Sequence, residues 1–394
     1  AYCFPSFLAY MSNKLLFRIH SWSALAVCLP LLVICLTGSV LVFKHEIDSL
    51  LMHDKVRVEP LPQRQSLDTL RHVVNETYPR YEVVGWSLFE DPSRADLVYV
   101  MAHGSSDWSY LLLDQYRADV LAPVVSTTHY LTDWLLELHY TLLLHDAGLL
   151  LSGLIAVILC LLGITGLWLH RSFWKNLFTL RTKARRVLYY SDLHKLVGAY
   201  ASPVLLVLGV TGAYWNLTHF AHEVEEHAGG QEHYKMQARL YNDELSLQAM
   251  HDRSEQALPA FDATYISLPW EPGQGIRFFG DIDSSNPLLS QYASSVHFDA
   301  QSGDLKEVYD IREQGVTAKT IDSFRRLHFG DFAGLPSRII WCLFGLAPAV
   351  LAFTGVSLWL KRRPQRRRAA AKAQAKEKTE LESPAQTPGS VSQV

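Results

Sequence analysis

Two apolar segments of this chain carry a histidine and a Thr-Gly pair at the same spacing. Thr37-Gly38 follows His20 by 17 residues, and Thr211-Gly212 follows His194 by 17 residues. Each histidine lies at the start of an apolar run, and each Thr-Gly pair lies inside one. A spacing that recurs in this way indicates internal duplication, which constrains the fold more than any other feature of the sequence.

A second kind of segment alternates with the first. Thr165-Gly166 follows His139 at a longer spacing, and Thr354-Gly355 follows His328 at that same longer spacing. Segments with the short spacing and segments with the long spacing therefore alternate along the chain, and each of the four segments has one histidine. Histidine is the commonest metal ligand in proteins, and its recurrence on repeated membrane helices is typical of a bundle that binds a metal-bearing cofactor.

The apolar runs are long enough to cross a membrane. The chain is 49% hydrophobic on average, but its apolar residues concentrate in four runs of about 20, the length that spans a hydrocarbon core of about 30 Å. The runs are 24–43, 149–169, 203–217 with its flanks, and 339–360. The sequence therefore predicts a membrane α-helical fold, with four transmembrane helices from an internal duplication and two α+β domains between them.

The expected boundaries follow from these runs. They are an N-terminal cytoplasmic segment (1–17), a first span (18–44), a first α+β domain (45–130), a short helix with the second span (131–170), a basic loop (171–190), a third span (191–218), a second α+β domain (219–320), a short segment with the fourth span (321–361) and a disordered tail (362–394).

Basic residues predict the orientation in the membrane. Lysine and arginine gather before the first span, within 171–190 and after residue 360, and such residues favour the cytoplasmic side. We therefore expect a multi-pass protein of the bacterial inner membrane, in contact with lipid, with both termini cytoplasmic and both α+β domains in the periplasm. Because this bias explains the basic loop, nucleic-acid binding is not expected.

Each polar block predicts one helix followed by strands. The apolar positions have helical spacing in 66–78 and 246–258, and they alternate in the segments that follow. The predicted strands are 83–89, 97–101, 110–114 and 117–121 in the first block, and 263–268, 275–280, 294–299 and 305–309 in the second.

The five cysteines exclude two kinds of redox centre. Neither Cys-x-x-Cys nor Cys-x-x-Cys-His occurs, so covalently attached c-type haem and thiolate-bound iron–sulfur clusters are not expected.

The predicted topology sorts the four histidines by depth. His20 and His194 begin spans that run outwards, whereas His139 and His328 precede spans that run inwards. A two-fold axis along the membrane normal would bring the members of each set together, as axial ligands of two b-type haems. Zinc is the rival cofactor, but it needs three or four ligands at one point. The glycines either give room to a macrocycle or let helices pack closely.

Further histidines form a second set of candidates. His45 and His219 each follow a Thr-Gly threonine by eight residues, and His145 and His170 bracket the second span. A Glu-rich stretch with histidines at 222, 227 and 233 is either a weak divalent-metal site or a solvated acidic helix.

Several short motifs, taken together, resemble the PepSY-associated transmembrane family. They are Leu-Phe-Arg-Ile-His at 16–20, Leu-His at 138–139, Asp-Leu-His-Lys at 192–195, Leu-His-Phe-Gly at 327–330 and the closing Thr354-Gly355 with Leu358-Trp359. The resemblance implies two haems, periplasmic PepSY-like domains and electron delivery to a ferric siderophore, with the hydroxamate type expected. Relatives commonly have glycine where this chain has His145.

The sequence thus predicts a dihaem reductase that passes electrons from the cytoplasmic side to ferric siderophore and releases Fe(II). No flavin or nicotinamide motif is present, so we expect a separate cytoplasmic or quinol electron donor. The alternative is a haem-free periplasmic PepSY-type binding or regulatory protein, in which the membrane histidines are structural.

Overall fold

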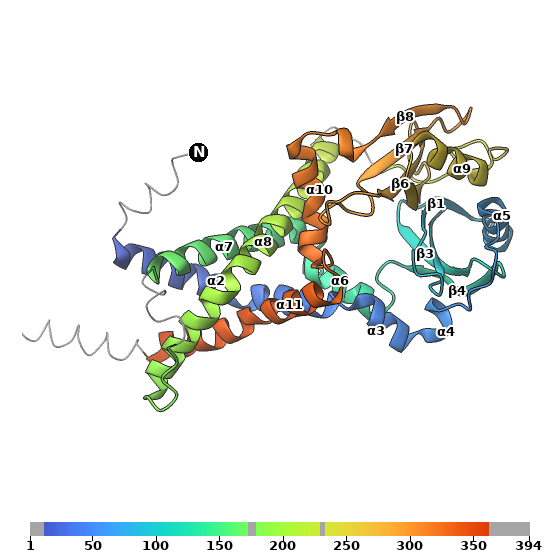
Figure 1. The fold of residues 1–394 in the computed structure, drawn as a ribbon. Helices are drawn as coiled ribbons and strands as arrows, with labels where there is room; N and C mark the ends of the chain where they lie inside the picture. Colours follow the sequence, from blue (N-terminus) through green and yellow to red (C-terminus); the bar gives the residue numbers. More distant parts are fainter. Residues whose placement is uncertain (1–11, 172–178, 229–232, 362–394) are drawn as a thin grey trace, which may run out of the picture. The chain divides into compact units, whose positions relative to one another are not determined.

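The computed structural model describes residues 12–171, 179–228 and 233–361 (Figure 1). Within it the chain forms two compact units. Unit 1 consists of the described residues within Ala1–Cys28, Leu162–Pro203 and Ala347–Val394, and unit 2 of those within Leu29–Leu161 and Val204–Leu346. The tail 362–394, predicted to be disordered, lies outside the described residues, as do 1–11 of the N-terminal segment and 172–178 of the basic loop.

Four helices are long and apolar enough to cross a membrane, as predicted. They are α2 (Asn13–Leu41), α7 (His145–Leu169), α8 (Arg186–Ala228) and a fourth span over Leu335–Lys361. The fourth begins as α11 (Leu335–Gly345), turns at Leu346 and continues as helix over 347–361. The third, α8, has 43 residues, well over the roughly 20 that a bilayer core requires.

The two polar blocks share one antiparallel sheet in unit 2. The first block supplies β1 (Tyr81–Ser87), β2 (Asp96–Ala102), β3 (Trp108–Asp114) and β4 (Asp119–Ser126), and the second supplies β5 (Phe261–Ser267), β6 (Ile276–Ile282), β7 (Ser294–Phe298) and β8 (Leu305–Tyr309). The strand order is β4-β3-β2-β1-β5-β6-β7-β8. The expectation of two separate α+β domains is therefore corrected to two halves of one sheet, since the pairing of β1 with β5 satisfies two strand edges that would otherwise be open.

One face of the sheet is covered by α5 (Leu67–Thr77) and α9 (Leu247–Ala257) (Figure 1). Side chains alternate across a strand, so Val98 and Val100 of β2 face this core while Tyr99 between them faces the other side. The core on this face is one cluster with members from both blocks. Serine caps begin both helices, because the hydroxyl oxygens of Ser66 and Ser246 accept hydrogen bonds from backbone N–H groups of the first turn.

Shorter helices connect the two halves of the sheet to the apolar helices. They are α3 (Lys44–Leu51), α4 (His53–Val56), α6 (Leu131–Thr141), the 3-10 helix η2 (Ile311–Glu313) and α10 (Val316–Phe329). Between α6 and α7 the chain reverses through three left-handed residues, Leu142, Leu143 and His145, with φ of 52°, 61° and 52°. Residues other than glycine rarely adopt this backbone conformation, so the reversal is strained.

Candidate functional site

His139 lies near the end of α6, with its ring against the backbone of α2. Its Nδ1 lies 2.8 Å from the carbonyl oxygen of Ile34 and 3.2 Å from the hydroxyl oxygen of Thr37. A carbonyl oxygen only accepts, so the Nδ1–H of His139 is the donor. This tautomer leaves the lone pair of Nε2 free to bind a metal.

His328, near the end of α10, has the equivalent partner on α8. Its Nδ1 lies 2.7 Å from the hydroxyl oxygen of Thr211. That hydroxyl donates its one hydrogen to the carbonyl of Val207, 2.8 Å away, so it accepts from the histidine N–H. His328 therefore has the same tautomer as His139.

The same contact occurs twice more in unit 1. The Nδ1 atoms of His20 and His194 lie 2.9 and 2.8 Å from the hydroxyl oxygens of Thr165 and Thr354. The hydroxyl of Thr354 donates to the carbonyl of Val350 at 2.7 Å, which again makes it the acceptor for the ring. Each histidine is thus bound to a Thr-Gly pair of another helix in its own half of the chain.

The glycine of each pair lies under the imidazole ring. A Cβ atom added to Gly38 would lie 2.7 Å from Cε1 of His139, which no packed structure tolerates without movement. The same atom on Gly212 would lie 3.3 Å from Cε1 of His328. On Gly166 and Gly355 it would lie 3.4 Å from the facing ring. The glycines therefore give room to the histidine that their threonine holds.

His139 and His328 lie side by side, although one precedes helix α8 in the sequence and the other follows it. Their ring centroids are 6.2 Å apart and their planes are inclined by 66°. A metal ion about 2 Å from one nitrogen of each ring would require a separation of roughly 6 Å. Burial lowers the pKa of both imidazoles, that of His328 to about 3, so both are neutral, the form that ligates metals. The donor set and its spacing fit a bis-imidazole metal centre.

The remaining candidate histidines do not join this pair. His145 is exposed, and its φ of 52° is a conformation that glycine adopts more readily than histidine does. His219 is 57% exposed on α8, 3.4 Å from Glu223. His45 lines a pocket in unit 2, and burial lowers its pKa to about 4. His170 lies directly after α7 in unit 1.

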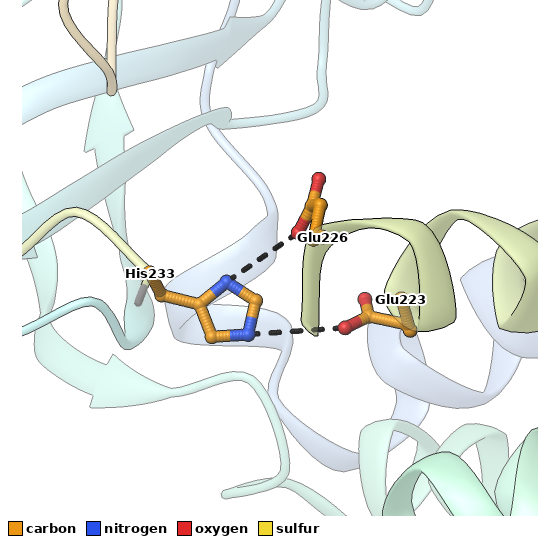
Figure 2. A group of neighbouring side chains, drawn as sticks. All are labelled: Glu223, Glu226 and His233. Atoms are coloured by element: carbon orange, nitrogen blue, oxygen red, sulfur yellow. Dashed lines mark ion pairs between the residues drawn. The ribbon is translucent and has the colours of Figure 1, made fainter. Parts of the chain in front are cut away.

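The Glu-rich stretch at the end of α8 forms a small cluster (Figure 2). His233 lies between Glu223 and Glu226, with N–O distances of 3.8 and 3.7 Å, and the donor atoms of all three lie within 4.8 Å of one another. His222 is exposed outside this group, and the side chain of His227 lies outside the described part of the chain. Their position at the end of a helix fits a solvated acidic segment, and the spacing of their donor atoms would also admit a weakly bound divalent ion.

Comparison with known proteins identifies the family. A family model described as the PepSY-associated TM region matches residues 17–362. The chain belongs to this family. An uncharacterized protein of Pseudomonas aeruginosa is 40% identical over 81 residues, which is 21% of this chain and 21% of that protein. The match thus spans about a fifth of that relative, so it identifies neither its activity nor the activity of this chain.

Proposed function

We propose that this member of the PepSY-associated family is a dihaem inner-membrane reductase. It would pass electrons from the cytoplasmic side to a ferric siderophore in the periplasm and release Fe(II). The observation that supports this function best is the histidine–threonine contact, which occurs at four positions and orients each ring through Nδ1. His20 and His194 would hold one b-type haem, and His139 and His328 the other. When bound, haem supplies reversible one-electron chemistry.

The protein's own part in this function is to fix the ligands. A threonine that accepts from Nδ1–H sets both the tautomer and the orientation of the ring, and such partners also make the ligating nitrogen more basic. The threonines are well enclosed, with exposures of 7% for Thr37 and 1% for Thr211, so water does not compete for the histidine N–H.

The substrate follows from coordination chemistry and from resemblance. Hard oxygen ligands hold Fe(II) less strongly than Fe(III), so reduction of a hydroxamate-type chelate would release its iron. The histidine and Thr-Gly motifs of the chain also resemble those of FoxB, the inner-membrane reductase of ferrioxamine-type siderophore uptake. A quinol or a cytoplasmic protein would be the electron donor.

An absorption spectrum tests the proposal directly. Protein purified in detergent from haem-replete cells should show a reducible b-type spectrum with two haems per chain, extractable by acid solvent. A colourless preparation that is folded by circular dichroism would contradict the proposal. It would favour the haem-free PepSY-type binding or regulatory protein instead.

Alanine variants test the pairing. His20→Ala and His194→Ala should each change the same low-spin haem signal, and His139→Ala and His328→Ala the other, because each removes one axial nitrogen. A double substitution within a pair should leave one haem intact. The assignment fails if His20→Ala and His139→Ala alter the same signal.

A further inference from the structure

Unit 2 contains a pocket of about 360 Å³, which is within the range of small-molecule sites, roughly 300–1,000 Å³. Its wall combines apolar and polar side chains. Leu88, Leu97 and Leu112 come from the sheet region, whereas Lys44 and His45 come from α3. Such a mixture suits a ligand with an apolar body and a few polar atoms.

The acidic groups of the pocket wall are mostly neutralised by neighbours. Lys44 lies 2.8 Å from carboxylate oxygens of both Asp48 and Asp133. Two further pairs, at 2.6 and 2.7 Å, are Arg57 with Asp91 and Arg338 with Glu46. Glu90, the remaining acid, is exposed. Because Lys44 alone serves the two buried acids Asp48 and Asp133, Arg94 supplies the second positive charge that balances them.

Arg94 differs from the other cations of the wall. Its guanidinium stacks on the ring of Phe89, with the central carbon 3.5 Å from the ring centroid. None of the described residues accepts a hydrogen bond from its side chain. Burial lowers the pKa of Arg94 to about 10, so the group remains charged at neutral pH. A planar set of five donors thus lines the pocket with its bonding capacity unused.

The pocket borders the two helices that carry the His139–His328 pair. Asp133, on its wall, precedes His139 on α6 by six residues, which is about 9 Å along a helix axis. Arg326, also on the wall, precedes His328 on α10 by two residues, about 3 Å. A ligand in the pocket would therefore lie close to this pair.

We infer that this pocket binds the ferric chelate, with the Arg94 guanidinium donating to a pair of hydroxamate or carboxylate oxygens on its surface. This inference rests on the proposed function, because it assigns that function's substrate to a place. Arg94 is a positioning residue: it holds the chelate beside the pair and takes no part in electron transfer.

Binding of a redox-inert analogue separates this inference from the proposed function. The probe is a gallium(III) tris-hydroxamate chelate, titrated by calorimetry into the full-length protein, because gallium binds like ferric iron but accepts no electron. Arg94→Gln should weaken binding at least about tenfold, as expected for loss of charge-assisted hydrogen bonds. The affinity of Arg94→Lys should lie between those of the unmodified protein and Arg94→Gln, because lysine keeps the charge but lacks the planar guanidinium.

Two further variants keep the test informative if Arg94 variants fold poorly. Gln291→Trp fills the pocket and should also weaken binding; the described hydrogen bond of Gln291 uses only its backbone carbonyl. Arg253→Gln is the matched control, because Arg253 also stacks on a phenylalanine, Phe298, but does not line the pocket. Its affinity should equal that of the unmodified protein.

Three results would overturn the inference. The first is absence of binding to the unmodified protein. The second is unchanged affinity in both Arg94→Gln and Gln291→Trp. The third is equally tight binding of metal-free citrate, which would mean that the pocket recognises a free carboxylate and not a chelate. Failure of the proposed function is seen separately, as missing haem absorption.

Discussion

If the chain binds the two proposed haems, replacing Thr211 by valine should loosen one of them and spare the other. Valine keeps the shape of threonine but lacks the hydroxyl that accepts from Nδ1 of His328 at 2.7 Å. No other described residue accepts a hydrogen bond from that nitrogen. Loss of a partner of this kind typically lowers metal affinity about 10- to 100-fold. We therefore expect Thr211→Val to weaken haem binding at the His139–His328 pair by this factor.

Thr37→Val is the matched comparison within the same pair. Thr37 lies 3.2 Å from Nδ1 of His139, but the carbonyl oxygen of Ile34, at 2.8 Å, is a second and closer acceptor. The histidine keeps a partner when the hydroxyl is removed. The expected loss is then less than about fivefold, since a neutral hydrogen bond contributes about 1 kcal/mol.

Transfer of haem to excess apomyoglobin measures the rate of haem release from both variants. The release rate from the His139–His328 pair should rise strongly in Thr211→Val and little in Thr37→Val, while the haem of the His20–His194 pair serves as an internal reference in each molecule. Equal release from both variants would refute the argument from tautomer and partner number. So would loss of the His20–His194 haem in Thr211→Val.

Three further outcomes are expected. Gly38→Ala should abolish haem binding at the adjacent pair, because its Cβ would lie 2.7 Å from His139, whereas Gly166→Ala, at 3.4 Å from His20, should be tolerated; pyridine haemochrome stoichiometry distinguishes the two. Leu70→Ala removes a fully buried side chain of the sheet core and should lower the free energy of unfolding by about 2–5 kcal/mol without changing a haem spectrum, as a urea titration would show. Reporter fusions at positions 185 and 285 should be active only in the cytoplasm and only in the periplasm, respectively, and the reverse pattern would overturn the proposed direction of electron flow.

The strands could be located from sequence because their signal is local. Alternation over 97–101 predicted β2, which covers Asp96–Ala102, and the segment 305–309 became β8 with the same bounds. The union of the two blocks could not be predicted in this way. It depends on β1 pairing with β5, where Trp86 lies opposite Ile266. No local pattern indicates which strand edges will meet when two apolar helices, α7 and α8, lie between them in the sequence.

The sequence contains enough information to predict which threonine each histidine contacts. Seventeen residues of helix extend about 25 Å, so His20 cannot contact Thr37 of its own helix. Successive membrane helices run antiparallel, which brings the start of α2, with His20, to the end of α7, with Thr165. The same geometry brings Thr37 to His139. The equal offsets between histidines and Thr-Gly pairs indicate that these residues belong together. The length of the helices shows that each histidine must contact the threonine of another helix.

The reversal between α6 and α7 could not have been read from the sequence. Leu142, Leu143 and His145 adopt left-handed backbone conformations that their side chains disfavour, and no glycine marks the position. Only the surrounding packing makes this conformation stable. The reversal separates His139, at the end of α6, from the apolar helix that follows, which frees its ring to turn towards α2 and His328.

A structural role alone explains the two rings of unit 2 less well than a ligand role does. A histidine held through Nδ1 keeps the lone pair of Nε2 available to a ligand, and a purely structural role gives no reason for two such rings to face each other. In His139 and His328 the Nδ1 atom is bound to threonine or carbonyl oxygen, and among the described residues none forms a hydrogen bond with either Nε2. The two rings lie 6.2 Å apart, at the separation that a shared metal requires. A metal between them would supply the partner that each Nε2 lacks. The ligand role is refuted if Nδ1 of His328 does not donate to Thr211, or if Nδ1 of His139 donates to neither Ile34 nor Thr37, because Nε2 would then carry the proton.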